Sequence, residues 1–173
     1  MCGRYVVPNT SDELLSLFDA FNSNAADWEP SYSVAPTDSA PIVREWIHEE
    51  TVQRDVDLAS WGLKPSWAKP GGPAPINARL ESVASNGMFR SAFASQRCLV
   101  PMAGYYEWQQ MDDGKQPYFI HGDGAVLAAA GLYAAIAEMG KVPDGALLQS
   151  QTRWSYFMIW SEQLCGNNAN AAI

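Results

Sequence analysis

The cysteine at position 2 is the first residue whose chemistry stands out, because it directly follows the initiator methionine in Met1-Cys2-Gly3-Arg4. Methionine aminopeptidase removes Met1 when the next residue is small, which would leave an α-amine and a thiol on adjacent carbons of Cys2. An aldehyde condenses with the amine to an imine, and the thiol then closes a five-membered thiazolidine ring. Both groups have pKa values not far above neutral, so their unprotonated forms are available in part. Taken alone, the position favours the alternative that Cys2 is an incidental terminal residue.

A second polar cluster lies in the segment PINARLE, residues 75–81, where an amide, a guanidinium and a carboxylate fall close together. The planar fork of Arg79 is suited to gripping a phosphate. Asn77 can both donate and accept a hydrogen bond beside a reacting amine or carbonyl. A turn held by side-chain hydrogen bonds explains the same residues equally well.

The third candidate is Glu107, which sits among aromatic residues in GYYEW, residues 104–108. A carboxylate in aromatic surroundings is expected to be desolvated, which raises its pKa and suits it to general acid–base catalysis. Considered by itself, the segment favours the alternative of an exposed glutamate on a strand with alternating faces.

Charge is unevenly distributed along the chain, whose formal net charge is −8. The window from Leu58 to Pro101 holds five basic side chains and a single acid, so it carries +4 and the rest carries −12. Aromatic and apolar residues interrupt the same window, and Trp67 and Met88 beside loop residues are the best candidates for exposure. Cations interleaved with flat side chains are typical of single-stranded DNA binding. Charge alone favours a chance run of solvated residues.

The rest of the sequence predicts the elements that must position these groups. Apolar residues at helical spacing predict a helix from Ser11 to Phe21, with Ser11 as N-cap and residues 22–24 as its stop. Strands are predicted over 32–35, 40–46, 52–59, 97–101, 118–121, 126–132 and 155–160. The turn at 112–114 predicts a hairpin that joins 105–110 to 116–120, and 67–75 is predicted to be a surface loop. We therefore expect an α+β domain, rich in strands and closed around one core.

Length and composition predict a single domain over residues 1–173, with 47% apolar residues. The sequence has no stretch of membrane-spanning length and no signal peptide, so we expect a soluble, intracellular protein without membrane contact. Three cysteines are too few for a disulfide scaffold, and Cys98, in an apolar run, is expected to be buried. With only His48 and His121 besides, we expect no metal site.

Seven segments together resemble the SRAP (SOS response-associated peptidase) family, whose members capture abasic sites in single-stranded DNA through a covalent bond to their second residue. In chain order they are MCGRY (1–5), YSVAPT (32–37), WGLKPSW (61–67), INARLE (76–81), RCLVP (97–101), GYYEW (104–108) and QPYFI (116–120). Each segment is weak alone, whereas seven in order are specific and span nearly the whole chain. The resemblance implies a barrel-like fold, rich in strands, with a few flanking helices.

The resemblance also implies a role for each matching residue. Cys2 is the crosslinking nucleophile after Met1 is removed, Asn77 positions the reacting terminus and the sugar, and Glu107 moves protons during ring opening and closure. The residues that hold DNA are Gly3, Arg4, Pro36, Trp67, Arg79, Met88 and Ser161. Removal of Met1, a lyase-like step through the imine and reversal of the crosslink are related activities. The implied partner is single-stranded DNA with abasic sites, bound by a monomer that needs no cofactor. Depending on the organism, it acts in the cytoplasm at the nucleoid or in the nucleus.

One feature of the family is not matched. The family continues with a motif like His-Asp-Arg-Met-Pro, and Ile173 falls where the residue before that histidine belongs. We therefore expect a SRAP domain that is incomplete at its C-terminus.

Two other classes of function stay open on the sequence. Class II glutamine amidotransferases also begin with Met-Cys-Gly, so an amide hydrolase with an N-terminal nucleophile is one alternative, although the glutamine-binding motifs of those enzymes are not visible. The other is a domain without catalysis that binds DNA or a protein partner.

Overall fold

The fold is built around a closed ring of strands. The computed structural model describes residues 3–65, 67–69, 71–124, 126–136 and 154–160. The strands are β1 (Arg4–Val7), β2 (Asn22–Asn24), β3 (Ser31–Val34), β4 (Ser39–His48), β5 (Thr51–Trp61), β6 (Asn77–Arg79), β7 (Arg97–Met102), β8 (Gly104–Met111), β9 (Gly114–His121), β10 (Leu127–Ala135) and β11 (Trp154–Trp160). The helices are α1 (Ser11–Phe18), α2 (Leu80–Val83) and α3 (Arg90–Ser95). Strand order β2-β5-β4-β7-β10-β11-β6, with an extra pairing of β5 to β11, closes five of these strands into a barrel.

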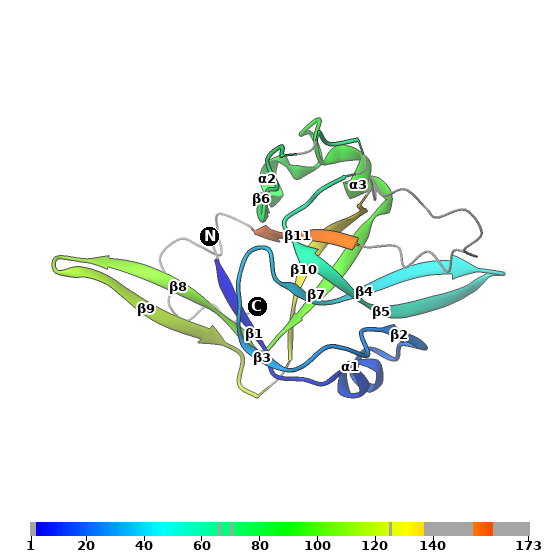
Figure 1. Ribbon diagram of the computed structural model, residues 1–173, viewed down its shortest axis with the longest axis horizontal. Coiled ribbons are helices and arrows are strands. Elements are labelled where there is room, and N and C mark those ends of the chain that lie inside the picture. Colours follow the sequence, from blue (N-terminus) through cyan, green and yellow to red (C-terminus); the bar gives the residue numbers. More distant parts are fainter. Residues whose placement is uncertain (1–2, 66, 70, 125, 137–153, 161–173) are drawn as a thin grey trace.

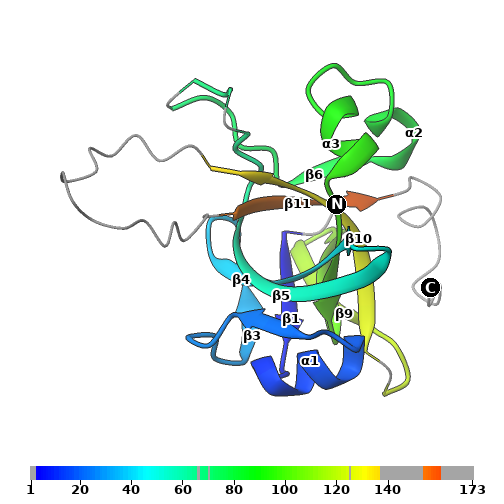
Figure 2. The same cartoon turned by 90° about the vertical axis from the view of Figure 1, so that its right-hand side faces the viewer.

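A second sheet, ordered β3-β1-β8-β9, packs on the barrel. The β8–β9 hairpin projects from one side of the body and the β4–β5 hairpin from the other, while α2 and α3 lie together at one end (Figure 1). Turning the molecule shows α1 on the side away from α2 and α3 (Figure 2). The predicted α+β fold with a barrel-like, strand-rich core and a few helices is confirmed.

Strand alternation explains why β11, with the sequence WSYFMIW, is apolar on both faces. Tyr156 and Met158 point into the core inside the barrel, whereas Phe157 points outward into a second core beneath α2 and α3. There the ring centroid of Phe157 lies 4.8 Å from that of Phe89. The outer core covers the outward face of the strand, so β11 has to be apolar on both of its sides.

The first helix differs in its bounds from the prediction. Thr10, not Ser11, is the N-cap: its side chain accepts from the backbone N–H of Glu13, whose carboxylate accepts in turn from the backbone N–H of Thr10. The helix ends at Phe18 because Asp19 takes a left-handed conformation, with φ of 50°. The expected stop at residues 22–24 is instead strand β2, which runs parallel to β5.

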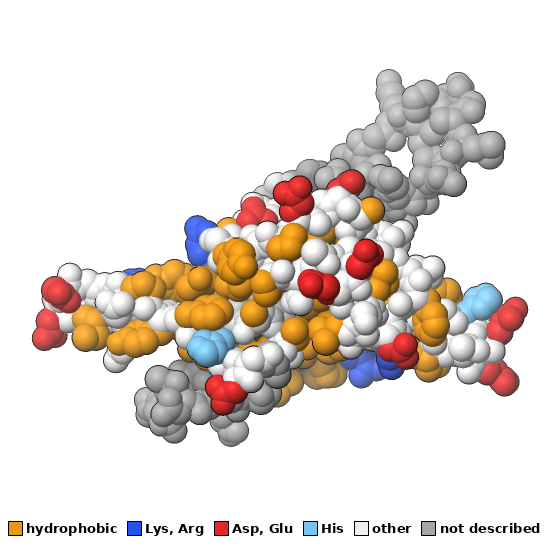
Figure 3. Space-filling view, turned by 90° about the horizontal axis from the view of Figure 1, so that it is seen from below, with side chains coloured by type: hydrophobic (Ala, Val, Ile, Leu, Met, Phe, Trp, Pro, Cys, Tyr) orange, Lys and Arg blue, Asp and Glu red, His pale blue; other side chains and the backbone are white. Residues whose placement is uncertain are grey.

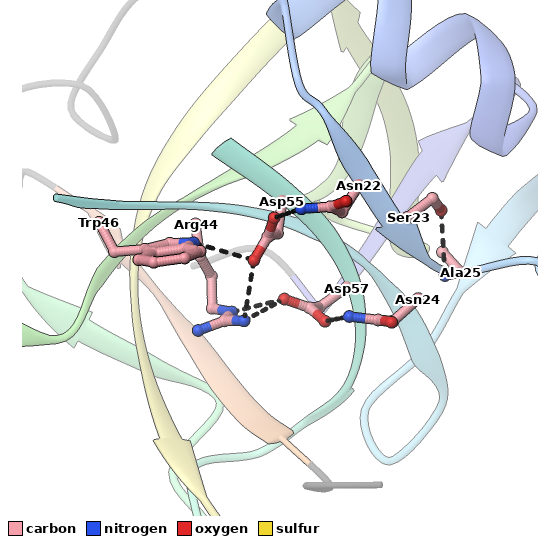
Figure 4. Close-up of polar contacts among 8 residues, drawn as sticks. All are labelled: Asn22, Ser23, Asn24, Ala25, Arg44, Trp46, Asp55 and Asp57. Carbon is pink, nitrogen blue, oxygen red and sulfur yellow. Dashed lines mark hydrogen bonds and ion pairs between the residues drawn. The ribbon is translucent and has the colours of Figure 1, made fainter. Parts of the chain in front are cut away.

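A buried charge cluster fastens β2 to the barrel (Figure 4). Arg44 of β4 donates from Nε to Asp57 at 2.6 Å, and its Nη2 lies 3.7 Å from Asp55. The two carboxylates also accept from the side-chain amides of Asn22 and Asn24, at 3.0 and 2.7 Å. Both aspartates are at least nine-tenths buried, and the guanidinium stacks on the ring of Trp154 at 4.2 Å. Every buried charge in the cluster therefore has a partner, which is the condition under which such groups are tolerated.

Candidate functional site

The start of the described chain lies beside the strand that carries Glu107. Strand β1 pairs antiparallel with β8, and the register sets Arg4 opposite Tyr106 and Tyr5 opposite Tyr105. Because the strands run in opposite directions, the residue before Arg4 lies opposite the residue after Tyr106. Gly3 therefore lies opposite Glu107. The register therefore brings the first described residues to Glu107. Cys2 itself, like Ser161, lies outside the described residues.

Asn77 reaches the same region from the other sheet. It begins β6, which runs parallel to β11 with Asn77 opposite Met158. The indole Nε1 of Trp160 donates to Asn77 Oδ1 at 2.8 Å. Since an indole nitrogen can only donate, this bond identifies the oxygen of the Asn77 amide and aims its nitrogen the other way. The orientation of the Asn77 amide is thus set by β11.

Aromatic contacts connect Asn77 to Glu107. The ring of Tyr105 lies 4.9 Å from the ring of Trp160, centroid to centroid. Tyr105 and Glu107 are two residues apart on β8, so their side chains lie on the same face of the strand. Glu107 is half-buried and stands directly opposite Tyr118 of β9. The fold therefore links an amide and a carboxylate that are 30 residues apart in the sequence, through Trp160 and Tyr105.

The backbone before Asn77 is fixed by buried groups. Trp61 is 1% exposed and donates from Nε1 to the carbonyl of Ile76 at 2.8 Å, and the backbone N–H of Met158 donates to the same carbonyl at 3.2 Å. The ring of Trp61 packs edge-on against Tyr5 of β1. The strand that carries Asn77 is therefore tied to the strand that follows the chain start.

A short hydrogen bond between two buried phenols, those of Tyr5 and Tyr156, holds β1 against β11. Burial, together with the neighbouring Tyr5 phenol, holds the pKa of Tyr156 well above the usual value for tyrosine. Tyr156 therefore stays protonated at neutral pH, and its hydrogen bond to Tyr5 acts as a structural clamp beneath the site.

The residues predicted to contact DNA fall on the surface around this centre. Arg4 is exposed, and its Nη1 donates to Ser33 of β3 at 2.7 Å. Arg79 is exposed at the end of β6, and Pro36 is half-buried in the turn after β3. That turn is joined to the barrel where the N–H of Thr37 donates to the carbonyl of Trp61 at 2.9 Å.

Trp67 and Met88 lie at the same hollow, although they are 21 positions apart in the sequence. Both line one small hollow of about 150 Å³, together with residues of α3 and the end of β10. Trp67 is 63% exposed and Met88 is 37% exposed, as expected, whereas Trp61 and Phe89 of the same window are buried. Their location together, next to α3, is compatible with a shared stacking contact.

Cys98 is buried, as expected. It is 7% exposed, and burial raises the pKa of its thiol far above the ordinary range, although nearby Arg44 partly opposes the shift. A thiol in this state is a poor nucleophile, since the reactive species is the thiolate.

Other features lie apart from this centre. A hollow of about 540 Å³, formed by α1, β4, β5 and β7, contains none of the predicted site residues.

Within the described part of the chain, no three His, Cys, Asp or Glu residues are grouped so as to hold a metal ion. Over the same residues, no helix has the length and apolar character needed to cross a membrane.

The sequence prediction missed the role of Trp160. A buried tryptophan needs an acceptor for its N–H, which is a signal that the sequence does carry. The identity of that acceptor is set by the parallel pairing of β6 with β11, and a three-residue strand is too short to recognise in a sequence.

Comparisons with known proteins agree with these observations. The model of the family described as SOS response associated peptidase (SRAP) matches residues 1–161. Among curated proteins, the chain is 34% identical over 138 residues to "Abasic site processing protein YoaM" of Bacillus subtilis, covering 77% of this chain and 59% of that protein. It is 29% identical over 153 residues to "Abasic site processing protein YedK" of Escherichia coli, covering 86% of this chain and 66% of that protein. The chain thus spans about three fifths to two thirds of the length of these relatives.

A similarity to a solved structure supports the fold. A protein from Bacteroides thetaiotaomicron, solved by X-ray crystallography, superposes with a TM-score of 0.72 at 20% sequence identity, over 91% of this chain and 67% of that one. At this level of identity, the similarity shows the shared architecture alone.

Proposed function

Because this chain belongs to the SOS response associated peptidase (SRAP) family, we propose that it captures abasic sites in single-stranded DNA through a covalent bond to Cys2. The observation that carries the proposal is the series of contacts from Asn77 through Trp160 to Tyr105, on the strand that carries Glu107 and pairs with the start of β1, two residues after Cys2. Relatives that carry the name "abasic site processing protein" support the choice of substrate.

The capture reaction uses the two groups of a free N-terminal cysteine. Met1 is first removed by hydrolysis of its peptide bond, which leaves the α-amine of Cys2. This amine attacks C1′ of the ring-opened deoxyribose aldehyde, and loss of one water gives an imine. The Cys2 sulfur then bonds to C1′ while the thiol proton passes to the nitrogen, which closes the thiazolidine. No oxidant, reductant or cofactor takes part in these steps.

Glu107 and Asn77 assist these steps from opposite sides. Glu107 is half-buried, and we assign it the transfer of protons to the sugar O4′ during ring opening and to the departing water during imine formation. Asn77, with its carbonyl held by Trp160 at 2.8 Å, presents its amide N–H groups to the reacting terminus and the sugar. A lyase-like cleavage of the strand from the same imine is a second expected outcome of this chemistry.

The exposed residues around the centre hold the strand. Arg4 and Arg79 pair with the phosphates that flank the lesion, since a guanidinium matches phosphate geometry. Gly3 allows close approach of the DNA backbone. Trp67 and Met88, which line one hollow, stack or wedge against bases, and Pro36 completes the channel. We propose that one copy of the domain is sufficient for this contact.

The proposal is tested by incubating the protein with single-stranded DNA that bears one abasic site and resolving the products by denaturing electrophoresis. A shifted band is expected with the wild-type protein and with Cys98→Ala, which removes a buried thiol, but not with Cys2→Ala. Glu107→Gln is expected to slow the appearance of the band while non-covalent DNA affinity stays unchanged. A band of full intensity from Cys2→Ala would show that the terminal cysteine is not the nucleophile.

A further inference from the structure

The β8–β9 hairpin carries an exposed apolar face on the side away from Glu107. Figure 3 shows hydrophobic side chains gathered over the projecting hairpin, with a histidine at the border of the patch. Register identifies this face: Tyr106 pairs with Phe119 and Trp108 pairs with Pro117, so all four side chains project to one side. Phe119 and Trp108 are each 41% exposed. Exposed apolar patches of this kind mark binding surfaces more often than chance.

Three of the rings on this face, those of Tyr106, Phe119 and His121, form a row. The ring centroid of Phe119 lies 5.0 Å from that of Tyr106 and 5.3 Å from that of His121. The rings of Phe119 and His121 are nearly parallel, with an interplanar angle of 24°. Tyr106 and Trp108 are two residues apart on β8, which is roughly 7 Å along the strand. The side chain of Trp108 therefore extends the apolar face toward the tip of the hairpin.

The row is held in place by a glycine. A Cβ added at Gly104 would lie 2.6 Å from the Phe119 ring and 2.5 Å from the carbonyl oxygen of Ile120. The absence of a side chain at Gly104 therefore lets the Phe119 ring lie across the sheet, between Tyr106 and His121. A ring with a fixed orientation loses little entropy when a ligand stacks on it.

At the end of the hairpin nearest the barrel, the charge on this face favours binding of a nucleic-acid strand over binding of an apolar partner. Arg4, exposed and opposite Tyr106, places a cation at the base of the row. At the other end, the tip of the hairpin carries Asp112 and Asp113, which repel phosphate and set the far limit of the surface. A single strand that passes Arg4 can thus stack two or three bases before it reaches the acidic tip.

We propose that this face, formed by Tyr106, Trp108, Phe119 and His121, is a base-stacking platform for the single strand that continues beyond the abasic site. The proposal rests on the proposed function only in its choice of single-stranded DNA as ligand. It adds a binding surface on the face of β8 opposite Glu107. Strand β8 would then contribute both to the reaction and to binding of the flanking DNA.

The test measures non-covalent binding of an undamaged, fluorescently labelled single strand by anisotropy. Trp108→Ala and Phe119→Leu are expected to weaken binding at least about 5-fold each, which corresponds to the lower limit of the stacking free energy per base. Leucine at 119 keeps an apolar side chain over Gly104 while removing the ring. Phe21→Ala is the matched control, since Phe21 is 63% exposed but follows α1, away from the hairpin. Unchanged affinity in both hairpin variants overturns the proposal.

A second measurement locates the bases. Strands that carry 2-aminopurine at successive positions on either side of the abasic site are crosslinked, and quenching is expected at two or three positions on one side only. Phe119→Leu is expected to restore that fluorescence at an unchanged crosslink yield. If the wild-type protein forms no crosslink while Trp108→Ala still weakens binding of undamaged DNA, the capture reaction is wrong and the platform stands. If the wild type is a dimer and the variants are monomers with unchanged DNA affinity, the face is an interface between two copies instead.

Discussion

Replacing Trp160 with phenylalanine isolates the hydrogen bond that orients Asn77. The change removes the Nε1 donor at 2.8 Å from Asn77 Oδ1 but keeps an aromatic ring against Tyr105. Loss of one hydrogen bond of this kind costs about 1 kcal/mol, and the smaller ring in a site that is 5% exposed adds about 1–2 kcal/mol more to the loss of stability. The Asn77 amide then loses the donor that holds its Oδ1, and we expect the rate of crosslink formation to fall about tenfold, or about 1.4 kcal/mol in activation free energy.

Two measurements separate the loss of stability from the loss of orientation. Urea unfolding gives the free energy of unfolding, and single-turnover electrophoresis gives the rate of adduct formation. The matched control is Trp28→Phe, because Trp28 also donates its Nε1 to a carbonyl oxygen, that of Asn9 at 3.0 Å, but in the α1 region. We expect the control to lose stability and keep its rate. Equal rates for Trp160→Phe, Trp28→Phe and the wild type would refute the argument that β11 orients Asn77.

Two further predictions concern stability. Arg44→Met leaves both buried carboxylates of β5 without their cation, so we expect the free energy of unfolding, measured in urea, to fall by about 3–5 kcal/mol. The control Arg54→Met removes an exposed ion pair and is expected to cost less than about 1 kcal/mol. Equal losses in the two variants would contradict this prediction. Because burial raises the pKa of Cys98, the folded state keeps a proton that the unfolded state loses above about pH 8.5. The free energy of unfolding should therefore fall by up to about 1.4 kcal/mol per pH unit above that point, and less steeply in Cys98→Ala; the same slope in both proteins would rule this out.

The sequence predicted the long elements and missed most of the short ones, for a physical reason. Strands β4, β5 and β11 carry enough apolar residues to be recognised, and the hairpin turn at 112–114 was identified from its glycine, which has φ of 148°. Strands β1, β2 and β6 have three or four residues each, and their pairing comes from partners distant in the chain. Local pattern holds no information about such partners.

The polar residues of the site were recognised by type, but their arrangement was not. Asn77 was compatible with a turn on local grounds, whereas in the structure it begins a strand. Cys98 could be predicted to be buried because an apolar run surrounds it, which needs no knowledge of topology. The contact of Trp160 with Asn77 depends on the parallel pairing of β6 and β11, which only the closed barrel defines.

Register is what links the candidate site to the exposed face of the hairpin. Strand β8 directs Tyr105 and Glu107 to one side and Tyr106 and Trp108 to the other, so a slip of one residue against β9 would move the partners of Tyr106 and Trp108 to the other face. Two features oppose such a slip. Only Gly104 leaves room for the ring of Phe119, and only Gly114 accepts the positive φ that closes the turn without strain. The same two glycines therefore fix the pairing of β8 with β9 that gathers Tyr106, Trp108 and Phe119 on one face of the hairpin.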